Sequence, residues 1–320
     1  MSGANSGLSV PGPVPTGTET GTGEPQARNE VVRRQRPGNS VAAVVLVVAS
    51  ALFLYGAATN PTYSWPTFAR YLLDVRVIEA ARNTLLLTVY SMVSAVVLGV
   101  LLAVMRLSPN RVLQWISWVY LWIFRGTPVY VQLVFWGLFS TIYKEIRLGI
   151  PFGPTLTTFS TQDVLSVFQL AVLGLALNEA AYMAEIVRSG ISSVDEGQAE
   201  SATALGLSWW QTMTRIVLPQ AMRVIIPPTG NEVISMLKTT SLVTAVPYSL
   251  ELYTRTRDIA SETFNPIPML LVASAWYLVF TSVLMVGQYY LERHFAHGIN
   301  RTRPTRRARA LSRAARGVPA

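Results

Sequence analysis

The sequence contains no cysteine and little charge, and both absences limit what the protein can be. Without cysteine the chain forms neither disulfides nor thiolate metal sites. Only 13% of its 320 residues are charged and 51% are hydrophobic, whereas about 25% of residues are charged in soluble domains. The composition therefore predicts a membrane protein with few large soluble parts.

Histidine is scarce as well. His294 and His297 are the two histidines, and they stand at the end of the last apolar stretch, beside a basic tail. Two histidines without an obvious third ligand are weak evidence for a metal centre. We interpret them as interfacial side chains and expect no metal site.

Motifs for nucleotide binding and catalysis are also missing. A P-loop requires Gly-x-x-x-x-Gly-Lys-Ser/Thr, but neither of the two lysines, Lys144 and Lys238, follows a glycine. The chain has no Gly-x-Ser-x-Gly nucleophile elbow and no His-Glu-x-x-His zinc pair. We therefore expect no catalytic residue on this chain, which argues against a membrane-embedded enzyme.

Long apolar stretches are what the sequence has instead. Crossing a bilayer as a helix takes about 20 apolar residues, and six stretches approximately qualify. They are 41–59, 83–105, 126–143, 164–187, 221–245 and 267–291. The first lies too deep in the chain for an ordinary signal peptide, so we interpret it as a retained span. The pattern predicts an all-α membrane protein with about six transmembrane helices.

The distribution of arginine and lysine predicts the orientation. Six spans place both termini on one side, and 18 of the 26 lysines and arginines then lie in segments on that side, against six on the other. Positive residues favour the cytoplasmic side, so we expect both termini in the cytoplasm and a multi-pass protein of the cell membrane. Orientation and contact with the lipid bilayer explain the net charge of +9, and no nucleic acid partner is expected.

The two ends of the chain differ from its apolar body. Residues 1–40 are rich in glycine, proline, serine and threonine and have few large apolar side chains, so we expect a disordered cytoplasmic N-terminal tail. Residues 296–320 are rich in arginine, and we expect a basic cytoplasmic C-terminal tail.

A loop at 188–220 is the longest ordered-looking segment on the cytoplasmic side. Ala199, Ala202 and Leu205 recur at helical spacing and predict a shared helix face. Acidic residues near the helix start suit the macrodipole, a glycine with positive φ can end the helix, and Ser208 can cap a second helix. The residues expected to contact another protein are Glu196, Glu200, Ala202, Leu205 and Gly206.

The same loop carries a recognisable signature. Across 200–219 the spacing is Glu-x-Ala, three residues, Gly, nine residues and Ile-x-Leu-Pro. This resembles the cytoplasmic EAA signature of permease subunits of type I ATP-binding-cassette importers, with Ser201 where a second alanine is usual. Segments that look like the polar amino acid uptake branch of that family are 83–108, RGTPVYVQL at 125–133, 178–198 and 218–242.

This resemblance covers about 80–295 and implies a five-helix permease domain there, preceded by an additional N-terminal transmembrane helix at 41–59. It implies that the loop at 188–220 holds the coupling helix. The partners it implies are an ATPase subunit, an extracytoplasmic solute-binding protein and a second permease subunit, identical or not. ATP and Mg would be bound by the ATPase, with no cofactor on this chain, and the cargo would be a polar or cationic amino acid.

Polar residues within the spans indicate where cargo passes. Ionisable groups are costly inside a membrane, which singles out Glu179 in the fourth span. Its carboxylate suits an ammonium or a cationic side chain, and an interhelical hydrogen bond or a pairing with Lys238 is the alternative. The expected residues of the substrate path are Asn178, Glu179, Tyr182 and Asn231.

The fifth span contains helix breakers. Pro227, Pro228 and Gly230 are expected to interrupt its hydrogen-bond ladder, and such breaks often mark transport paths. A simple kink against neighbouring helices is the alternative.

Two other functions remain open from the sequence. An ion-driven secondary transporter needs carboxylates within the membrane, for which Glu179 gives thin support. A non-transporting membrane sensor or scaffold built on permease spans would share every feature above.

Overall fold

The computed structural model describes residues 37–150 and 155–295. Residues 1–36 of the expected N-terminal tail and the whole expected C-terminal tail lie outside this range. The chain divides into two compact units, Met1–Ala57 and Ala58–Ala320. The first unit contributes α1 (Pro37–Thr59), which begins four residues before the expected boundary because proline is tolerated in the first turn of a helix.

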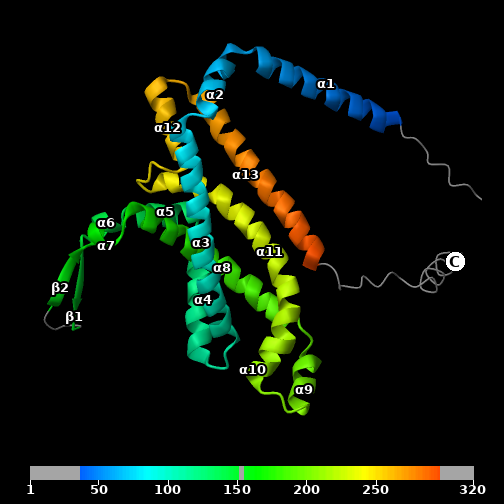
Figure 1. Ribbon diagram of the computed structural model, residues 1–320, viewed down its shortest axis with the longest axis vertical. Coiled ribbons are helices and arrows are strands. Elements are labelled where there is room, and N and C mark those ends of the chain that lie inside the picture. The colour runs from blue at the N-terminus through cyan, green and yellow to red at the C-terminus, as the bar shows by residue number, and fades with distance from the viewer. Residues whose placement is uncertain (1–36, 151–154, 296–320) are drawn as a thin grey trace, which may run out of the picture. The chain divides into compact units, whose positions relative to one another are not determined.

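The second unit is built mainly from helices (Figure 1). Its first half contains a short 3₁₀ helix (Pro61–Tyr63), α2 (Trp65–Leu72), α3 (Val75–Leu107), α4 (Arg111–Gly126), α5 (Val129–Gly137), α6 (Phe139–Ile142), β1 (Glu145–Gly149) and β2 (Thr155–Ser160). Its second half contains α7 (Thr161–Val164), α8 (Val167–Ser192), α9 (Glu196–Ala204), α10 (Trp209–Thr212), a π-helix (Met213–Val217), α11 (Leu218–Thr239), a 3₁₀ helix (Thr240–Ala245), α12 (Leu252–Thr263) and α13 (Pro266–Phe295).

Helices α3 and α8 pack side by side and form the centre of the second unit (Figure 1). Small residues allow this closeness: a Cβ on Gly99 would lie 2.6 Å from the Cβ of Met183. Small residues let helix backbones approach in membrane proteins. Local signals set the starts of both helices, since Asp74 caps α3 and Ser166 forms a capping box with Gln169 at α8.

The predicted third span at 126–143 is not one helix. Helix α4 ends at Gly126, and α5 begins after Pro128. Proline lacks the N–H that would continue the ladder and pushes the preceding residue out of helical geometry, and Thr127 indeed adopts an extended ψ of 144°. The proline therefore separates α4 from the predicted span, and the span itself is divided at Leu138, between α5 and α6.

A β-hairpin corrects the prediction that the protein is all-α. Strands β1 and β2 pair antiparallel, and Glu145 stands opposite Ser160. The segment is rich in threonine and contains isoleucine and phenylalanine, residue types that favour strands. Figure 1 shows the hairpin extending away from the helices.

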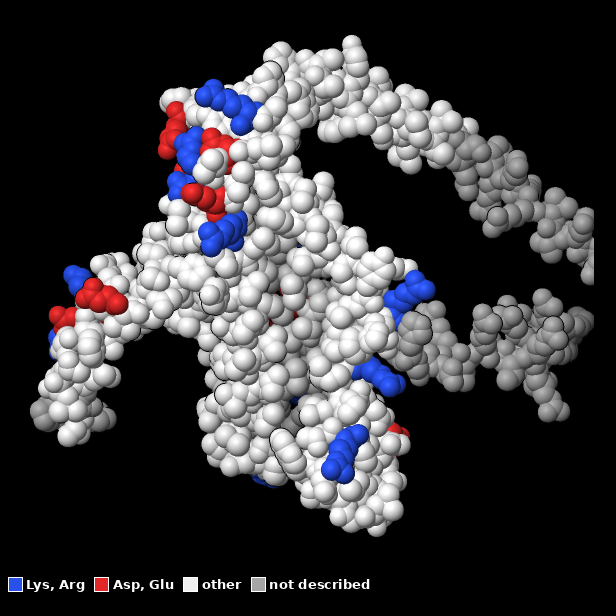
Figure 2. Space-filling view, viewed as in Figure 1, with Lys and Arg blue, Asp and Glu red and all other residues white. Residues whose placement is uncertain are grey.

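Four helices among the described residues are long and apolar enough to cross a membrane. They cover Val41–Thr59, Val75–Leu107, Val167–Ser192 and Pro266–Phe295. These match four of the six predicted spans, while 126–143 is divided and 221–245 falls mainly in the less apolar α11. On the face of the second unit shown in Figure 2, charged side chains gather mainly towards its ends. The sixfold count and the cytoplasmic termini stay predictions.

Candidate functional site

Glu179 is an almost completely buried acid in α8, with 8% of its surface exposed. Its Oε1 atom has no hydrogen-bond partner in the part of the chain that the structure describes. The carboxyl group of Glu232, on α11, interacts with it. A buried charge without a counterion is unfavourable, and a second carboxylate adds repulsion. The pair therefore favours a cation from outside the chain.

A cleft of about 260 Å³ lies beside this pair. Its walls are formed by Arg125, Tyr182, Glu185, Ile186, Ser189, Val224, Pro228 and Glu232. The guanidinium carbon of Arg125 lies 5.5 Å from the centre of the Tyr182 ring, a cation–π contact. Because Glu185 is already bound to Arg188, Glu232 is the cleft carboxylate that has no ion pair among the described residues.

The other predicted path residues have different environments. Asn178 donates to the carbonyl of Phe124 (3.0 Å) and to Oε1 of Gln132 (3.1 Å), so it ties α8 to the break between α4 and α5. Asn231 is exposed and does not line the cleft. The structure thus places Tyr182 in the cleft, with Glu179 beside its wall, and gives Asn178 a supporting contact.

The alternative partner of Glu179 is not formed. Lys238 is exposed and takes part in none of the ion pairs of the described residues. An acid that is both buried and unpaired is the feature that sequence reasoning could suspect but not establish.

Helix α11 continues through the double proline, which corrects the predicted interruption. A neighbour supports it there: Gln288 of α13 donates from Nε2 to the carbonyl of Pro227 (2.8 Å). Gly230 makes room for this side chain, because a Cβ there would lie 1.7 Å from Oε1 of Gln288. Neighbouring helices can satisfy backbone groups around proline in a membrane, so α13 stabilises what the isolated sequence would break.

The predicted coupling element has the expected local construction. Asp195 caps α9, and Gly206 ends it with φ 75°. The N–H of Gly206 donates to Thr203, and that of Leu207 donates to Ala202, which together form a Schellman motif. Ser208 forms a capping box at α10, as its position predicted.

The side chains of this element divide into inward and outward groups. Ala202 is buried, whereas Leu205 is 82% exposed, so these two residues do not share one contact face as predicted. Trp209 and Trp210 are also largely exposed. Glu196 and Glu200 are exposed on α9. Ala202 therefore packs within its own chain, and the exposed surface combines large apolar side chains with two acidic ones.

A π-helix at Met213–Val217 joins α10 to α11. Its last bond runs from the N–H of Leu218 to the carbonyl of Met213. Pro219, which follows, has no N–H to donate, and it stands in the first turn of α11. The connection is helical throughout, so α10 and the cleft-lining helix α11 are continuous.

Sequence reasoning underrated two residues at the cleft. Neither Arg125 nor Glu232 is among the residues predicted for the substrate path. Both line the cleft with Tyr182.

The ranges 37–150 and 155–295 contain no cluster of three metal-ligating acidic or histidine side chains.

Comparison with known proteins gives consistent matches. Residues 95–297 match the family described as binding-protein-dependent transport system inner membrane component. The arginine transport system permease protein ArgU of Corynebacterium glutamicum is 58% identical over 286 residues, which cover 89% of each chain. The histidine/lysine/arginine/ornithine transport system permease protein HisM of Escherichia coli is 38% identical over 205 residues, covering 63% of this chain and 81% of the relative.

A solved structure agrees with these relatives. The crystal structure of an amino acid ABC transporter with histidines is similar with a TM-score of 0.57 and 30% identity, covering 68% of this chain and 94% of that chain.

Proposed function

The chain belongs to the family of binding-protein-dependent transport system inner membrane components, and we propose that its cargo is a cationic amino acid. It is an integral membrane permease of an ATP-binding-cassette importer for amino acids. The observation that carries the proposal is the buried carboxyl of Glu179, whose Oε1 has no hydrogen-bond partner among the described residues, with Glu232 against it.

The chemistry of the cleft fits such a cargo. A cationic amino acid carries one carboxylate and two positive groups. Arg125 offers a guanidinium to the carboxylate, since the planar fork of arginine suits that group. Glu232 and Glu179 offer negative charge to an ammonium or guanidinium of the cargo. The similarity to a permease that is named for arginine transport supports the same class.

The decisive test is direct binding of arginine to the purified transporter without its receptor, with citrulline as the neutral ligand of the same shape. In Glu179→Gln we expect the affinity for arginine to fall at least about tenfold, as charged contacts in dry sites do, with little change for citrulline. Glu145→Gln, on the exposed hairpin, is the control.

An equal loss for both ligands, which share the α-ammonium, would show that Glu179 does not recognise the side-chain charge of the cargo. No loss for arginine would place the cargo elsewhere.

We further propose that α9 and α10 bind the ATPase subunit. The exposed side chains of Leu205, Trp209 and Trp210 form an apolar surface of the kind that a partner groove accepts. Glu196 and Glu200 stand beside it, and Gly206 sets the turn between the two helices. The continuous helical path into α11 gives this surface a mechanical connection to Glu232.

A pair of exposed leucines tests this surface. Leu205→Asp should weaken co-purification with the ATPase by at least about tenfold, since central apolar anchors dominate interfaces. Leu156 on the hairpin is similarly exposed, at 78% against 82%, so Leu156→Asp should leave the ATPase bound. Retention of the ATPase by Leu205→Asp would remove the assignment, and Glu200→Arg offers an independent check.

The remaining partners follow from the importer architecture. A solute-binding protein would deliver the cargo at the extracytoplasmic face, and a second permease subunit, identical or different, would complete the path. ATP and Mg would be bound by the ATPase, with no catalysis on this chain. Uptake should persist when proton and sodium gradients are collapsed while ATP remains, an outcome that an ion-driven transporter would not give.

A further inference from the structure

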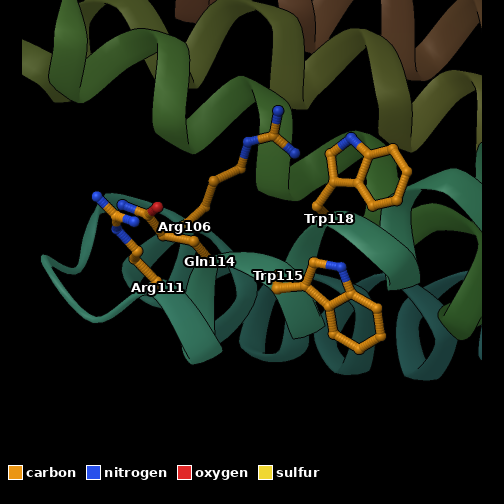
Figure 3. A pocket seen from close by; sticks show the side chains of 5 residues that line it. All are labelled: Arg106, Arg111, Gln114, Trp115 and Trp118. Carbon is orange, nitrogen blue, oxygen red and sulfur yellow. The ribbon is translucent and has the colours of Figure 1, made fainter.

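A second pocket of about 500 Å³ lies at the turn between α3 and α4 and shares no lining residue with the cleft beside Glu179. It is lined by Arg106, Arg111, Gln114, Trp115 and Trp118. Figure 3 shows Arg111 and Gln114 near the turn and the two tryptophans farther along α4. Two cations thus share one pocket with two large aromatic rings.

The arginines of this pocket are available to a ligand. Neither Arg106 nor Arg111 takes part in an ion pair within 37–150 and 155–295. The carboxylate of Glu185 interacts electrostatically with Arg106, but it is already bound to Arg188. Arg106 is half-buried, and a partly desolvated cation without a counterion favours an anion.

The turn itself is held by local hydrogen bonds. Asn110 caps α4 by accepting from the N–H of Val112 (2.9 Å), and Gln114 donates from Nε2 to the carbonyl of Ser108 (2.8 Å). These bonds fix the start of α4, with Arg111, next to the last turn of α3, with Arg106. The partial charges of the two helix ends are opposite in sign and offset each other, so the positive charge of the pocket comes from the two arginines.

The position of the pocket along α3 indicates which layer of the bilayer surrounds it. Helix α3 has 33 residues, which at about 1.5 Å per residue makes it longer than the hydrocarbon layer of about 30 Å. Its last turn therefore reaches the headgroup level. Trp115 and Trp118 are mostly exposed, and tryptophan prefers that level. Figure 1 shows the turn at the same end of the second unit as α9 and α10.

We propose that this pocket binds the headgroup of an anionic phospholipid from the leaflet on the coupling side. The phosphate and its neighbouring anionic charge meet Arg106 and Arg111. The rings of Trp115 and Trp118 lie against the glycerol and the first acyl carbons. The occupant is lipid rather than free phosphate because the aromatic part of the lining matches the apolar part of a lipid.

The test uses the full-length chain, purified with its partner subunits, in nanodiscs of neutral phosphatidylcholine containing brominated phosphatidylglycerol or brominated phosphatidylcholine. Bromine quenches tryptophan on contact. We expect excess quenching by the anionic lipid, and the double variant Arg106→Gln/Arg111→Gln should lower the relative association of that lipid about tenfold, since each basic group near the surface contributes to such binding.

Controls separate this pocket from general charge effects and from other anions. Arg147→Gln, on the hairpin, should retain the excess quenching. Trp115→Phe/Trp118→Phe should lose most of it while native mass spectrometry still finds the bound anionic lipid. Inorganic phosphate at millimolar concentration should not displace the lipid.

Three outcomes would overturn the proposal. They are unchanged lipid preference in Arg106→Gln/Arg111→Gln, displacement of the lipid by inorganic phosphate, and loss of the ATPase from the double variant in detergent without any change in lipid binding. The last outcome would assign the two arginines to the protein partner. Binding of arginine by the cleft is measured separately, so neither result depends on the other.

Discussion

Glu251 and Glu179 are both buried glutamates, yet their surroundings differ completely. Glu251 has no exposed surface and accepts hydrogen bonds from Thr84, Tyr277 and both the N–H and the hydroxyl of Thr254. Glu179 has an oxygen without a partner among the described residues and a second carboxyl beside it. Buried polar groups are normally hydrogen-bonded, and the unpartnered oxygen of Glu179 is what supports the proposed ligand site.

Three helices meet at Glu251, and this explains why its side chain accepts so many hydrogen bonds. The residue caps α12, and its partners come from α3 and α13, so one side chain connects three helices. The N–H of Leu252 also donates to Thr84 (3.0 Å). A buried acid that satisfies several elements at once has a structural role, whereas Glu179 has the features of a binding group.

The sharpest test of this contrast is truncation of each acid. Glu251→Ala should lower the free energy of unfolding by about 3 kcal/mol, because it leaves several buried donors unsatisfied. Glu179→Ala should leave stability unchanged or raise it, because it removes a buried carboxyl with an unsatisfied oxygen. Thermal unfolding of the purified protein in detergent measures both variants, and equal destabilisation would end the contrast.

A second test concerns the close contact between Gly230 and the side chain of Gln288. Gly230→Ala should destabilise by about 1–3 kcal/mol, as overpacking does, because the new Cβ collides with Gln288, which holds the carbonyl of Pro227. Gly287→Ala is the matched control, since a Cβ there meets nothing within 4 Å. Adding Gln288→Ala to Gly230→Ala should recover part of the loss in a double-mutant cycle. Strict additivity would contradict the collision.

A third test examines the carboxyl beside Glu179. Glu232→Gln should weaken arginine binding by a smaller factor than Glu179→Gln, roughly threefold to tenfold, because Glu232 is only half-buried and surface charges are worth less. Stability should not fall, since repulsion is removed. Equilibrium dialysis with labelled arginine measures the affinity, and a loss larger than that of Glu179→Gln would reverse the two roles.

The smallest expected effect is on the pH dependence of stability that Glu251 causes. Burial raises the pKa of Glu251, in the loop before α12, despite the hydrogen bonds that it accepts. The folded state therefore binds the proton more tightly than the unfolded state, and the contribution to stability is greatest in acid and declines as pH rises through the folded pKa. Glu251→Gln should remove this decline in unfolding scans between acid and neutral pH. An identical pH profile would contradict it.

Local signals in the sequence predicted the turn and the cap between α9 and α10 well. Gly206 and Ser208 act within a few residues of themselves, so their turn and cap could be read from spacing, and the structure confirms both. The outward position of Leu205 could not be read, because it depends on how α9 packs against the rest of the chain. The long apolar helices α3, α8 and α13 were also predictable, since length and composition suffice.

The sequence was less informative about backbone breaks. Pro128 separates α4 from α5 at the start of a predicted span, whereas Pro227 and Pro228 stand inside a continuous helix. The difference is tertiary: Gln288, 61 residues away in the chain, bonds to the carbonyl of Pro227. The hairpin was missed because its short strands lie between two apolar stretches.

The sequence by itself determined that the chain crosses a membrane and that a helix ends at Gly206 and another is capped by Ser208, because hydropathy and capping act locally. Only the tertiary structure decided which buried acid has its oxygens hydrogen-bonded and which has an oxygen without a partner among the described residues. Glu251 meets Thr84 from 167 positions away, and Glu179 meets a second acid from another helix. Such partners are brought together by packing, and no local pattern encodes them.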